Sequence, residues 1–367
     1  MIIGIDGNEA NVEKRVGSNQ YAFELLHALR DLESGDTFII YLREQPLPDL
    51  PKPDGHWRYK VFGPKTFWTQ WRLPLELYLG QSKSQVFFTP GHYAPRWSPI
   101  PTVISIMDLG YLKFPQQFTK KDLYQLTAWT KRSIKSASHI FAISQSTKND
   151  IIKAYGIAED KITVTYPGYD NNKFKIENVK FKIEEAKKKY GIKGEYILFL
   201  STLKPSKNIE GLLEAFSQLT RMNPVKLVIA GKKGWLYETI FEKVKQLNLE
   251  EKTVFTDFVA EEDMPGLMRS AKVFVLPSFW EGFGIPVVEA MACGVPIVVS
   301  DRGSLPEIVN KAGIIVNPDS PESIAKGIES AIKNSAELKK AGLENVKRFS
   351  WKECAEITLE KLKEVGK

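Results

Sequence analysis

The chain alternates short apolar runs with longer segments in which apolar residues recur every three or four positions. The short runs are typical of strands buried on both faces of a parallel sheet, and the longer spacing is typical of helices that cover such a sheet. The clearest helical segments in the first half are residues 18–32, 119–136 and 146–155. Strands are expected there at residues 2–5, 37–42, 59–62, 86–89, 102–106, 139–143 and 162–165.

The pattern changes after Tyr166-Pro167-Gly168, where a polar stretch and a lysine-rich helical segment at residues 179–190 follow. A second series then begins, with strands expected at residues 196–201, 226–230, 253–255, 273–276, 295–300 and 314–316. This predicts an α/β protein with two doubly wound, Rossmann-like parallel-sheet domains facing a cleft. The expected domains are residues 1–175 and 176–349, with a last helix at 350–367 that packs back on the first domain.

Length and charge agree with a two-domain protein. The chain has 367 residues, of which 43% are hydrophobic and 26% charged, enough for two cores and a polar surface. The net charge is +7, a modest excess of 51 basic over 44 acidic residues, which is typical of a mixed, solvated surface. Cys293 and Cys354 form no paired motif, and no signal-peptide pattern or long apolar span occurs, so we expect a cytoplasmic protein.

The most informative segment is 278–294, which follows the strand expected at 273–276. Gly282 and Gly284 lie in a loop there, and Pro286 fits the first turn of a helix. A glycine loop that enters a helix directs free backbone N–H groups and the positive helix end at an anion such as a diphosphate.

Two carboxylates, Glu281 and Glu289, flank this loop. Glu281 can reach a sugar beside the phosphates, and Glu289 can accept hydrogen bonds from the two neighbouring hydroxyls of a ribose. The plain alternative is a solvated loop glutamate and a glutamate on a helix surface.

A second cationic loop precedes the helix expected at residues 209–219. Lys204 and Lys207 lie there beside a helix start, where an ammonium group can bind phosphate. Solvated lysines at a helix start are the alternative.

In the first domain, Gly17 leads into a helix that begins at Ser18, an arrangement that suits either an anion or an ordinary turn. Asp108 follows the strand expected at 102–106. Its carboxylate can contact an acceptor hydroxyl or cap the next turn.

These residues carry a family resemblance. The Glu-x7-Glu spacing of Glu281 and Glu289 is flanked by Pro277-Ser278, by the run from Glu289 to Pro296, and by Ser304-Leu305-Pro306-Glu307. Over essentially its whole length the chain resembles the retaining GT-B glycosyltransferases of family 4, also called glycosyl transferases group 1, and especially members that transfer mannose.

The resemblance implies a role for each matching residue. Glu281 would contact the donor sugar and the reacting centre, Glu289 would hold the ribose, and Lys207 matches the family's phosphate-binding lysine. Thr202 stands where an arginine is frequent, and Lys204 is expected to compensate. The remaining expected donor-binding groups are the backbone of Gly282, Phe283 and Gly284 and the loop at Gly17. Glu281, Asp108 and Lys207 are the expected catalytic residues.

The sequence also departs from the family pattern. Met107 replaces the usual histidine before Asp108, which puts the acceptor side in question and makes His92 a substitute to consider. Asp257 replaces a glycine common where the nucleotide base binds. Trp235, in the Gly-Lys-Lys-Gly-Trp run, belongs to the mannosyltransferase-like part of the resemblance or serves in packing.

The resemblance implies a retaining hexosyltransferase that needs no metal and no cofactor, and no Asp-x-Asp motif occurs in the chain. GDP-mannose is the first donor candidate and UDP-sugars follow, with a saccharide or lipid-linked saccharide as acceptor in polysaccharide or glycoconjugate synthesis. Two alternatives remain open: a catalytically silent nucleotide-sugar-binding protein, and another two-domain enzyme such as an epimerase or dehydrogenase. The second lacks a Gly-x-Gly-x-x-Gly motif after the first strand.

A basic helix in the first domain raises the expectation of peripheral contact with an anionic membrane, at its inner face, and not with nucleic acid. Trp68, Trp71 and Trp129 are candidate interfacial anchors, with core packing as the alternative. The basic residues are Lys113, Lys120, Lys121, Lys131, Arg132 and Lys135.

Overall fold

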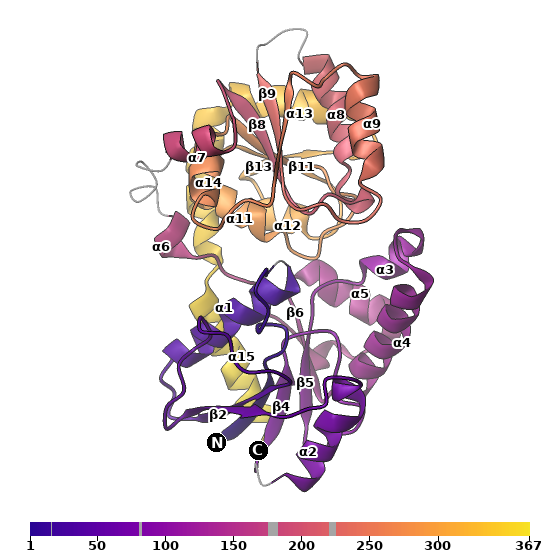
Figure 1. Cartoon of the computed structure of the whole chain (residues 1–367), viewed down its shortest axis with the longest axis vertical. Helices are drawn as coiled ribbons and strands as arrows, with labels where there is room; N and C mark the ends of the chain where they lie inside the picture. Colours follow the sequence, from indigo (N-terminus) through magenta and orange to yellow (C-terminus); the bar gives the residue numbers. More distant parts are fainter. Residues whose placement is uncertain (16, 81–82, 175–182, 220–224) are drawn as a thin grey trace. The chain divides into compact units, whose positions relative to one another are not determined.

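A computed structural model describes residues 1–15, 17–80, 83–174, 183–219 and 225–367. The chain forms two compact units (Figure 1). The first comprises Met1–Gly168 together with Ser350–Lys367, and the second comprises Tyr169–Phe349. The boundary expected at residue 175 lies outside the described residues, and α6 (Asn171–Phe174) already belongs to the second unit.

The strands of the first unit form one parallel sheet in the order β3-β2-β1-β4-β5-β6-β7. The register is continuous, with Ile3 opposite Phe38 on β2 and Val86 on β4. The central strands are buried on both faces, which explains their uninterrupted apolar sequences. The strands are β1 (Ile2–Asp6), β2 (Thr37–Leu42), β3 (Trp57–Val61), β4 (Val86–Thr89), β5 (Thr102–Ile106), β6 (His139–Ala142) and β7 (Ile162–Val164).

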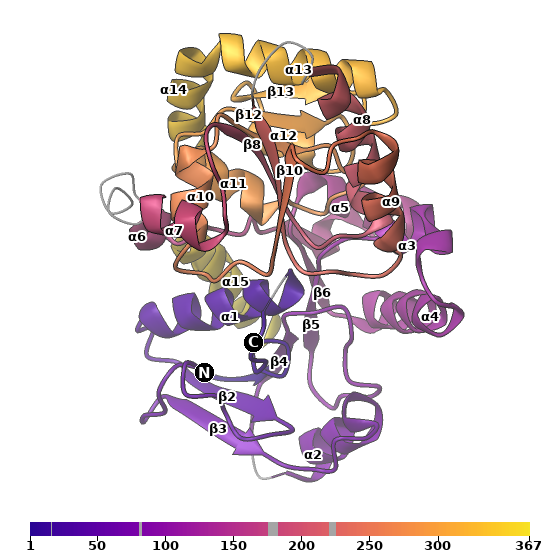
Figure 2. The ribbon, with the colours of Figure 1, turned by 45° about the horizontal axis from the view of Figure 1, so that its top comes forward.

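Helices cover both faces of this sheet, as Figure 2 shows. Long helices here are α1 (Ser18–Asp31), α4 (Lys120–Ser136) and α5 (Gln145–Tyr155), and shorter segments are η1 (Trp68–Arg72), α2 (Leu73–Leu79), α3 (Gly110–Lys113), η2 (Pro115–Gln117) and η3 (Glu159–Lys161). Thr119 and Ser144 cap α4 and α5 through their side-chain oxygens, as expected for residues that start a helix.

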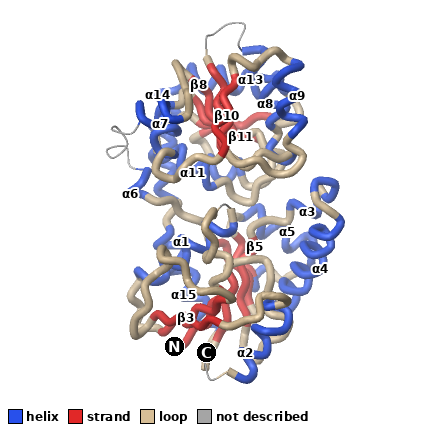
Figure 3. The backbone as a smooth tube through the Cα atoms, in the orientation of Figure 1, coloured by secondary structure: helices blue, strands red, loops and turns tan. Residues whose placement is uncertain are grey.

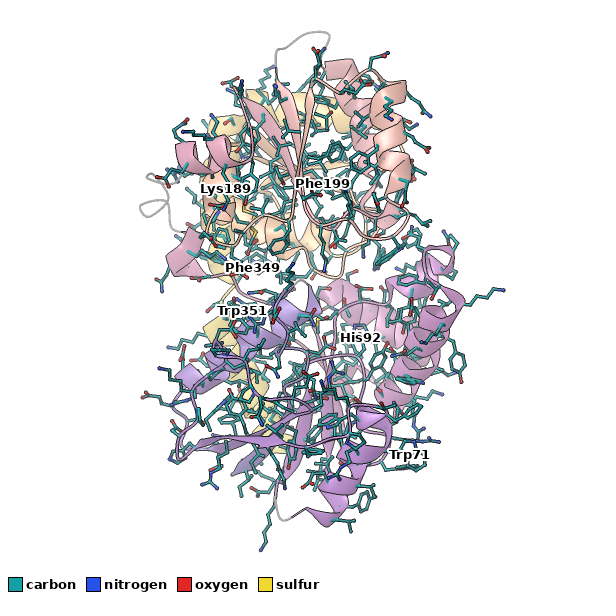
Figure 4. All side chains as sticks on the ribbon, viewed as in Figure 1. Trp71, His92, Lys189, Phe199, Phe349 and Trp351 are labelled. Atoms are coloured by element: carbon teal, nitrogen blue, oxygen red, sulfur yellow. The ribbon has the colours of Figure 1, made fainter. Side chains whose placement is uncertain are left out.

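The last helix, α15 (Trp351–Val365), belongs to the first unit and packs on α1. The rings of Trp351 and Tyr21 lie 5.8 Å apart. Trp351, labelled in Figure 4, begins the helix directly after the chain leaves the second unit. The close approach of Gly168 to the Trp351 backbone, where a Cβ would lie 2.1 Å from the Trp351 nitrogen, fixes this re-entry.

The strands of the second unit form another parallel sheet, in the order β10-β9-β8-β11-β12-β13. Phe199 on β8, labelled in Figure 4, is fully buried in its core. Figure 3 separates these strands from the helices around them. The strands are β8 (Tyr196–Leu200), β9 (Lys226–Ala230), β10 (Thr253–Asp257), β11 (Val273–Leu276), β12 (Ile297–Ser300) and β13 (Gly313–Val316).

The helices of the second unit pack as two groups, one in which α8 contacts α9 and α13 and one in which α11 contacts α10, α12 and α14. This arrangement confirms the expected fold class of two Rossmann-like, doubly wound parallel-sheet domains. The helical segments are α7 (Ile183–Lys189), η6 (Pro205–Lys207), α8 (Ile209–Leu219), α9 (Glu238–Gln246), α10 (Met264–Ser270), α11 (Ile285–Ala292), α12 (Leu305–Val309), α13 (Pro321–Lys333), α14 (Ser335–Asn345) and η7 (Val346–Arg348).

The strands lie within two residues of the ranges expected from the sequence. The helix expected at residues 179–190 is observed as α7, and the part of that expectation before residue 183 lies outside the described residues.

Candidate active site

The order of strands in the second unit reverses between β8 and β11, which are hydrogen-bonded neighbours. In open α/β sheets, ligands bind beyond the carboxyl ends of the strands at such a reversal. The loop after β8 contains residues 201–208, and the loop after β11 contains residues 277–284. The topology therefore brings the two loops singled out in the sequence to one place.

Lys207 and Glu281 form an ion pair at this place. The Lys207 Nζ donates to Glu281 Oε1 at 2.5 Å, and their side chains are 11% and 12% exposed. A buried pair of this kind lies where an incoming anion can compete for the ammonium group. The sequence predicted both residues as site residues, and the structure brings them into contact.

The backbone that carries Lys207 is held by Asn208. Asn208 adopts a left-handed conformation with φ of 54°, which asparagine tolerates better than most residues. Its buried amide nitrogen donates to the carbonyl oxygens of Pro277 at 3.1 Å and Pro318 at 2.7 Å. The β8 loop is thus tied to the β11 loop, and Asn208 is a site-positioning residue that the sequence analysis missed.

Glu281 is held from its own side as well. The Ser278 hydroxyl donates to Glu281 Oε1 at 2.8 Å, so this one oxygen accepts two hydrogen bonds. The backbone N–H of Ser304 donates to the Glu281 carbonyl at 3.1 Å, and the Ser304 hydroxyl donates to the Phe283 carbonyl at 3.1 Å. The Ser304 segment, noted in the sequence only as part of a family pattern, therefore positions the carboxylate loop.

The loop enters α11 through Gly284, whose φ of 95° favours glycine. Pro286 stands in the first turn of the helix, as expected. Gly282 is buried, and the Phe283 side chain is a core residue that packs edge-on against Phe349 at 5.5 Å between ring centroids. Only backbone groups of Phe283 are therefore suited to bind a ligand.

Glu289 is half-buried within α11, beyond its first turn. It lies close enough to Cys293 for its charge to act on the thiol. Burial first, and then the negative charge of Glu289, raises the pKa of Cys293 to about 12, so this thiol is unreactive. Glu289 thus lies on the helix that begins at the glycine loop.

Thr202 and Lys204 lie in the loop between β8 and η6, and both are half-buried. The Lys204 Nζ lies 5.0 Å from the centroid of the Trp235 ring, a cation–π contact. Trp235 is 42% exposed, so it is not a core packing residue. A pocket of about 350 Å³ opens beside Lys204 and is lined among others by Asn208, Glu210, Phe279 and Asp319.

Asp257, which stands where the family commonly has glycine, adopts φ of 54° at the end of β10. Its side chain is exposed, and its carbonyl oxygen accepts from the Gly231 N–H at 2.9 Å. The position keeps the left-handed conformation that glycine favours, although its side chain differs.

In the first unit, Gly17 precedes α1 with φ of 56° and ψ of −118°, a conformation that L-residues avoid. Glu9 fixes the start of this helix. Its Oε2 accepts from the Ser18 hydroxyl at 3.3 Å and from Asn19 Nδ2 at 2.8 Å. Burial raises the pKa of Glu9, and the sequence analysis did not identify it as a site residue.

Asp108 lies just beyond β5, and its Oδ1 accepts from the Gly110 N–H at 2.7 Å. It therefore caps the following turn. Met107 is buried, and its backbone N–H donates to His92 Nε2 at 3.3 Å. His92, labelled in Figure 4, thus contacts the position where the family has its histidine, and burial lowers its pKa against the opposing effect of Asp108.

Comparison with known proteins identifies the family of the chain. The model for glycosyl transferases group 1 matches residues 182–348, and the model for glycosyltransferase family 4 matches residues 16–173. The O-antigen chain mannosyltransferase B of Escherichia coli is 31% identical over 284 residues, covering 76% of this chain and 74% of that protein. The chain belongs to the group 1 glycosyltransferases.

Two further relatives bear on this glycosyltransferase. The serotype-specific mannosyltransferase WbdA of Escherichia coli is 33% identical over 232 residues, but the match covers only 28% of that longer protein. Anabaena HepE, solved in complex with UDP and glucose, is 21% identical with a TM-score of 0.76, and the match covers 99% of each chain. The structural likeness identifies the GT-B fold.

Among the described residues, no helix of this glycosyltransferase is both long and apolar enough to cross a membrane.

Proposed function

We propose that this glycosyltransferase moves a hexose from a nucleotide-sugar donor to a saccharide or lipid-linked saccharide, with retention of the anomeric configuration. The observation that carries the proposal is the Lys207–Glu281 ion pair at the β8–β11 reversal, beside the glycine loop that enters α11. It supplies a cation, a carboxylate and a helix N-terminus in one place.

In the proposed reaction, Lys207 binds the donor diphosphate and gives up part of its contact with Glu281. Backbone N–H groups of Gly282, Phe283 and Gly284 bind the phosphate and the sugar, and Glu289 binds the ribose. Glu281, still held by Ser278, contacts the donor sugar near the reacting carbon. Thr202, Lys204 and the Gly17 loop complete the donor contacts, and Asp108 accepts a hydrogen bond from the acceptor hydroxyl.

The bond between the sugar and the phosphate breaks on the face at which the acceptor oxygen attacks. The acceptor proton passes to the departing phosphate oxygen, so no protein nucleophile is needed. The negative charge that develops on the nucleoside diphosphate is stabilised by Lys207 and the start of α11. We propose on this basis that transfer requires no metal ion and no cofactor.

GDP-mannose is the first donor candidate. Relatives named as mannosyltransferases support mannose, whereas HepE, of the same fold, was solved with UDP and glucose, so UDP-sugars are the second candidate. The relatives' role in O-antigen chains supports a polysaccharide or its lipid-linked precursor as acceptor. Peripheral contact with an anionic membrane belongs to the same proposal, supported by the exposed lysines of α4.

The proposal is tested by offering GDP-, UDP-, dTDP- and ADP-sugars to the wild type without added metal and measuring release of nucleoside diphosphate, with and without acceptor. Glu281→Ala, Glu289→Ala and Lys207→Ala are compared in parallel, with circular dichroism as a folding control. We expect turnover of one donor, undiminished by EDTA, and its loss in all three variants.

Failure of the wild type to turn over any donor, with binding retained, would favour the silent nucleotide-sugar-binding protein. Turnover that requires a nicotinamide cofactor would contradict the proposal altogether.

A further inference from the structure

The pocket beside Lys204 lies apart from the ion pair and the glycine loop of the donor site. Its volume is about 350 Å³, within the range of pockets that bind small molecules. The described residues that line it include neither Lys207 nor Glu281 nor any residue from 282 to 284. It is formed around α8, α9 and α13, which lie together in the second unit (Figure 1).

Three carboxylates line the pocket, and each is held by a hydrogen-bond donor nearby. Among the described lining residues, Lys204 is the one cation that faces them. An ionised carboxylate only accepts hydrogen bonds, so this set of side chains suits a ligand with several hydroxyl groups. The carboxylates are Glu210, which accepts from the Thr239 hydroxyl, Glu214, which accepts from Lys243 Nζ at 2.7 Å, and Asp319, which accepts from the Arg302 guanidinium at 2.7 Å.

Apolar side chains border the same pocket. Trp235 is 42% exposed, and the Lys204 ammonium group lies over its ring, 5.0 Å from the centroid. Leu236 lines the pocket and is 57% exposed, and Phe279 lines it as a half-buried ring. Aromatic rings beside hydrogen-bonding groups suit a ligand that has both an apolar face and polar edges.

The loop that carries Trp235 and Leu236 is fixed on the loop after β8. The Gly234 N–H donates to the Leu203 carbonyl oxygen at 2.9 Å, and a Cβ at Gly234 would lie 2.6 Å from that oxygen. Leu236 adopts φ of 55°, a left-handed conformation that leucine rarely adopts. Strained residues of this kind are concentrated at functional sites, so the conformation of Leu236 points to a ligand independently of the lining.

The lining selects among the ligands that a pocket of this size can hold. Three carboxylates facing one ammonium group disfavour a phosphate or another anion. Four charged side chains disfavour a purely apolar ligand, because its binding would remove them from water without giving them new partners. A sugar ring meets both conditions, since its hydroxyls can donate to carboxylates and its C–H face can pack on an aromatic ring.

The pocket shares a segment of chain with the donor site. Asn208 lines the pocket, whereas the neighbouring Lys207 binds Glu281. The Phe279 N–H donates to the Ser206 carbonyl at 2.9 Å, so the aromatic ring of the pocket is tied to the same segment. This proximity favours a saccharide that takes part in the reaction.

We propose that the pocket binds a sugar unit of the acceptor saccharide, other than the unit that is glycosylated. Trp235 packs on the C–H face of this sugar, and Glu210 and Asp319 accept hydrogen bonds from its hydroxyls. The inference rests on the saccharide acceptor of the proposed function and locates part of its binding site. It assigns Trp235 to acceptor binding, where the sequence left packing as an alternative.

The test is isothermal titration calorimetry of the full chain, without donor, with α-linked mannotetraose, maltotetraose and cellotetraose. We expect the wild type to bind at least one of them. Binding should be about tenfold weaker in Trp235→Ala and in Asp319→Asn, because each variant lacks one of the proposed contacts. Trp235→Phe keeps an aromatic ring and should recover most of the affinity. Trp71→Ala, which removes a 51% exposed tryptophan from the first unit, is the matched control and should bind as the wild type does.

Failure of the wild type to bind any of the three saccharides would overturn the inference, as would equal binding by Trp235→Ala. Binding of GDP that becomes about tenfold weaker in Trp235→Ala would place the donor in the pocket and would also overturn it. Release of nucleoside diphosphate from the donor is measured on the same wild-type preparation. Donor turnover without saccharide binding would count against the pocket alone, and saccharide binding without donor turnover would count against glycosyl transfer alone.

Discussion

Replacing Lys207 by methionine removes the ammonium group and leaves Glu281 buried without its cation. In the wild type the two are 2.5 Å apart and about nine-tenths shielded from water. Glu281 would keep the hydrogen bond from the Ser278 hydroxyl. We therefore expect the second unit to lose stability as well as donor turnover.

The expected loss is about 3 kcal/mol in the free energy of unfolding, because breaking a buried pair leaves a desolvated charge without a partner. Glu281→Gln should cost a similar amount by leaving the ammonium group unpaired. The double variant Lys207→Met/Glu281→Gln buries no charge and should recover at least half of the loss. None of the three variants should turn over donor at the wild-type rate.

The two cysteines allow each unit to be followed by itself. The chain contains two, and both are buried: Cys293 in the second unit and Cys354 in the first. Pulsed thiol labelling at increasing urea, read by mass spectrometry, therefore reports the unfolding of each unit separately. Lys207→Met should lower the urea midpoint at Cys293 and leave that at Cys354 unchanged.

The reasoning would be refuted if the urea midpoint of Cys293 labelling showed less than about 1 kcal/mol of destabilisation in both single variants. So would a double variant as unstable as the sum of the single variants, because the pair would then have no energetic coupling.

Three further changes test the surroundings of the two loops. Asn208→Ala removes two hydrogen bonds from a buried amide, and the Cys293 midpoint should fall by about 2 kcal/mol; an unchanged midpoint would contradict the positioning role. Gly17→Ala places a Cβ at a residue with φ of 56°, where no other atom lies within 4 Å. Backbone strain alone should therefore lower the free energy of unfolding of the first unit by about 1 kcal/mol, measured from the urea midpoint of Cys354 labelling. A larger loss would indicate a steric clash instead. Burial raises the pKa of Asp6 from 3.8 to about 6, against hydrogen bonds from Asn8, so the folded state binds this proton more tightly than the unfolded state. The stability that this group contributes is therefore present below about pH 4 and is lost as the pH rises to about 6. In Asp6→Asn, the urea midpoint measured by circular dichroism should no longer fall between these two pH values. A pH profile equal to that of the wild type would show that Asp6 is not the group involved.

The sequence predicted the sheets well because their strands are buried on both faces and read as uninterrupted apolar runs. It also identified Lys207 and Glu281 as candidate site residues, because each lies in a glycine- or lysine-bearing loop between a strand and a helix, and their roles stay predictions. It did not predict that the two side chains pair, since that contact depends on β8 and β11 being neighbours in space. The strand order is not encoded locally in the sequence.

Other details depend on conformation in the same way. Asn208 ties two loops because it adopts a left-handed conformation, and nothing in its neighbours distinguishes it from a helix-start asparagine. The tryptophans at 68 and 71 differ by less than one helical turn, yet one is buried and the other exposed. Which of the two tryptophans is buried depends on the side of η1 that faces the sheet, and the sequence does not show this.

The most direct test of the central claim is the release of GDP from GDP-mannose, without metal, by the wild type and Glu281→Gln. Glu337→Gln, a change to an exposed glutamate on α14, is the matched control. The account predicts that Glu281→Gln loses at least about a hundredfold in rate while the control equals the wild type. If Glu281→Gln released nucleoside diphosphate at the wild-type rate from whichever nucleotide sugar the wild type accepts, the Lys207–Glu281 pair would not be the centre of the donor site.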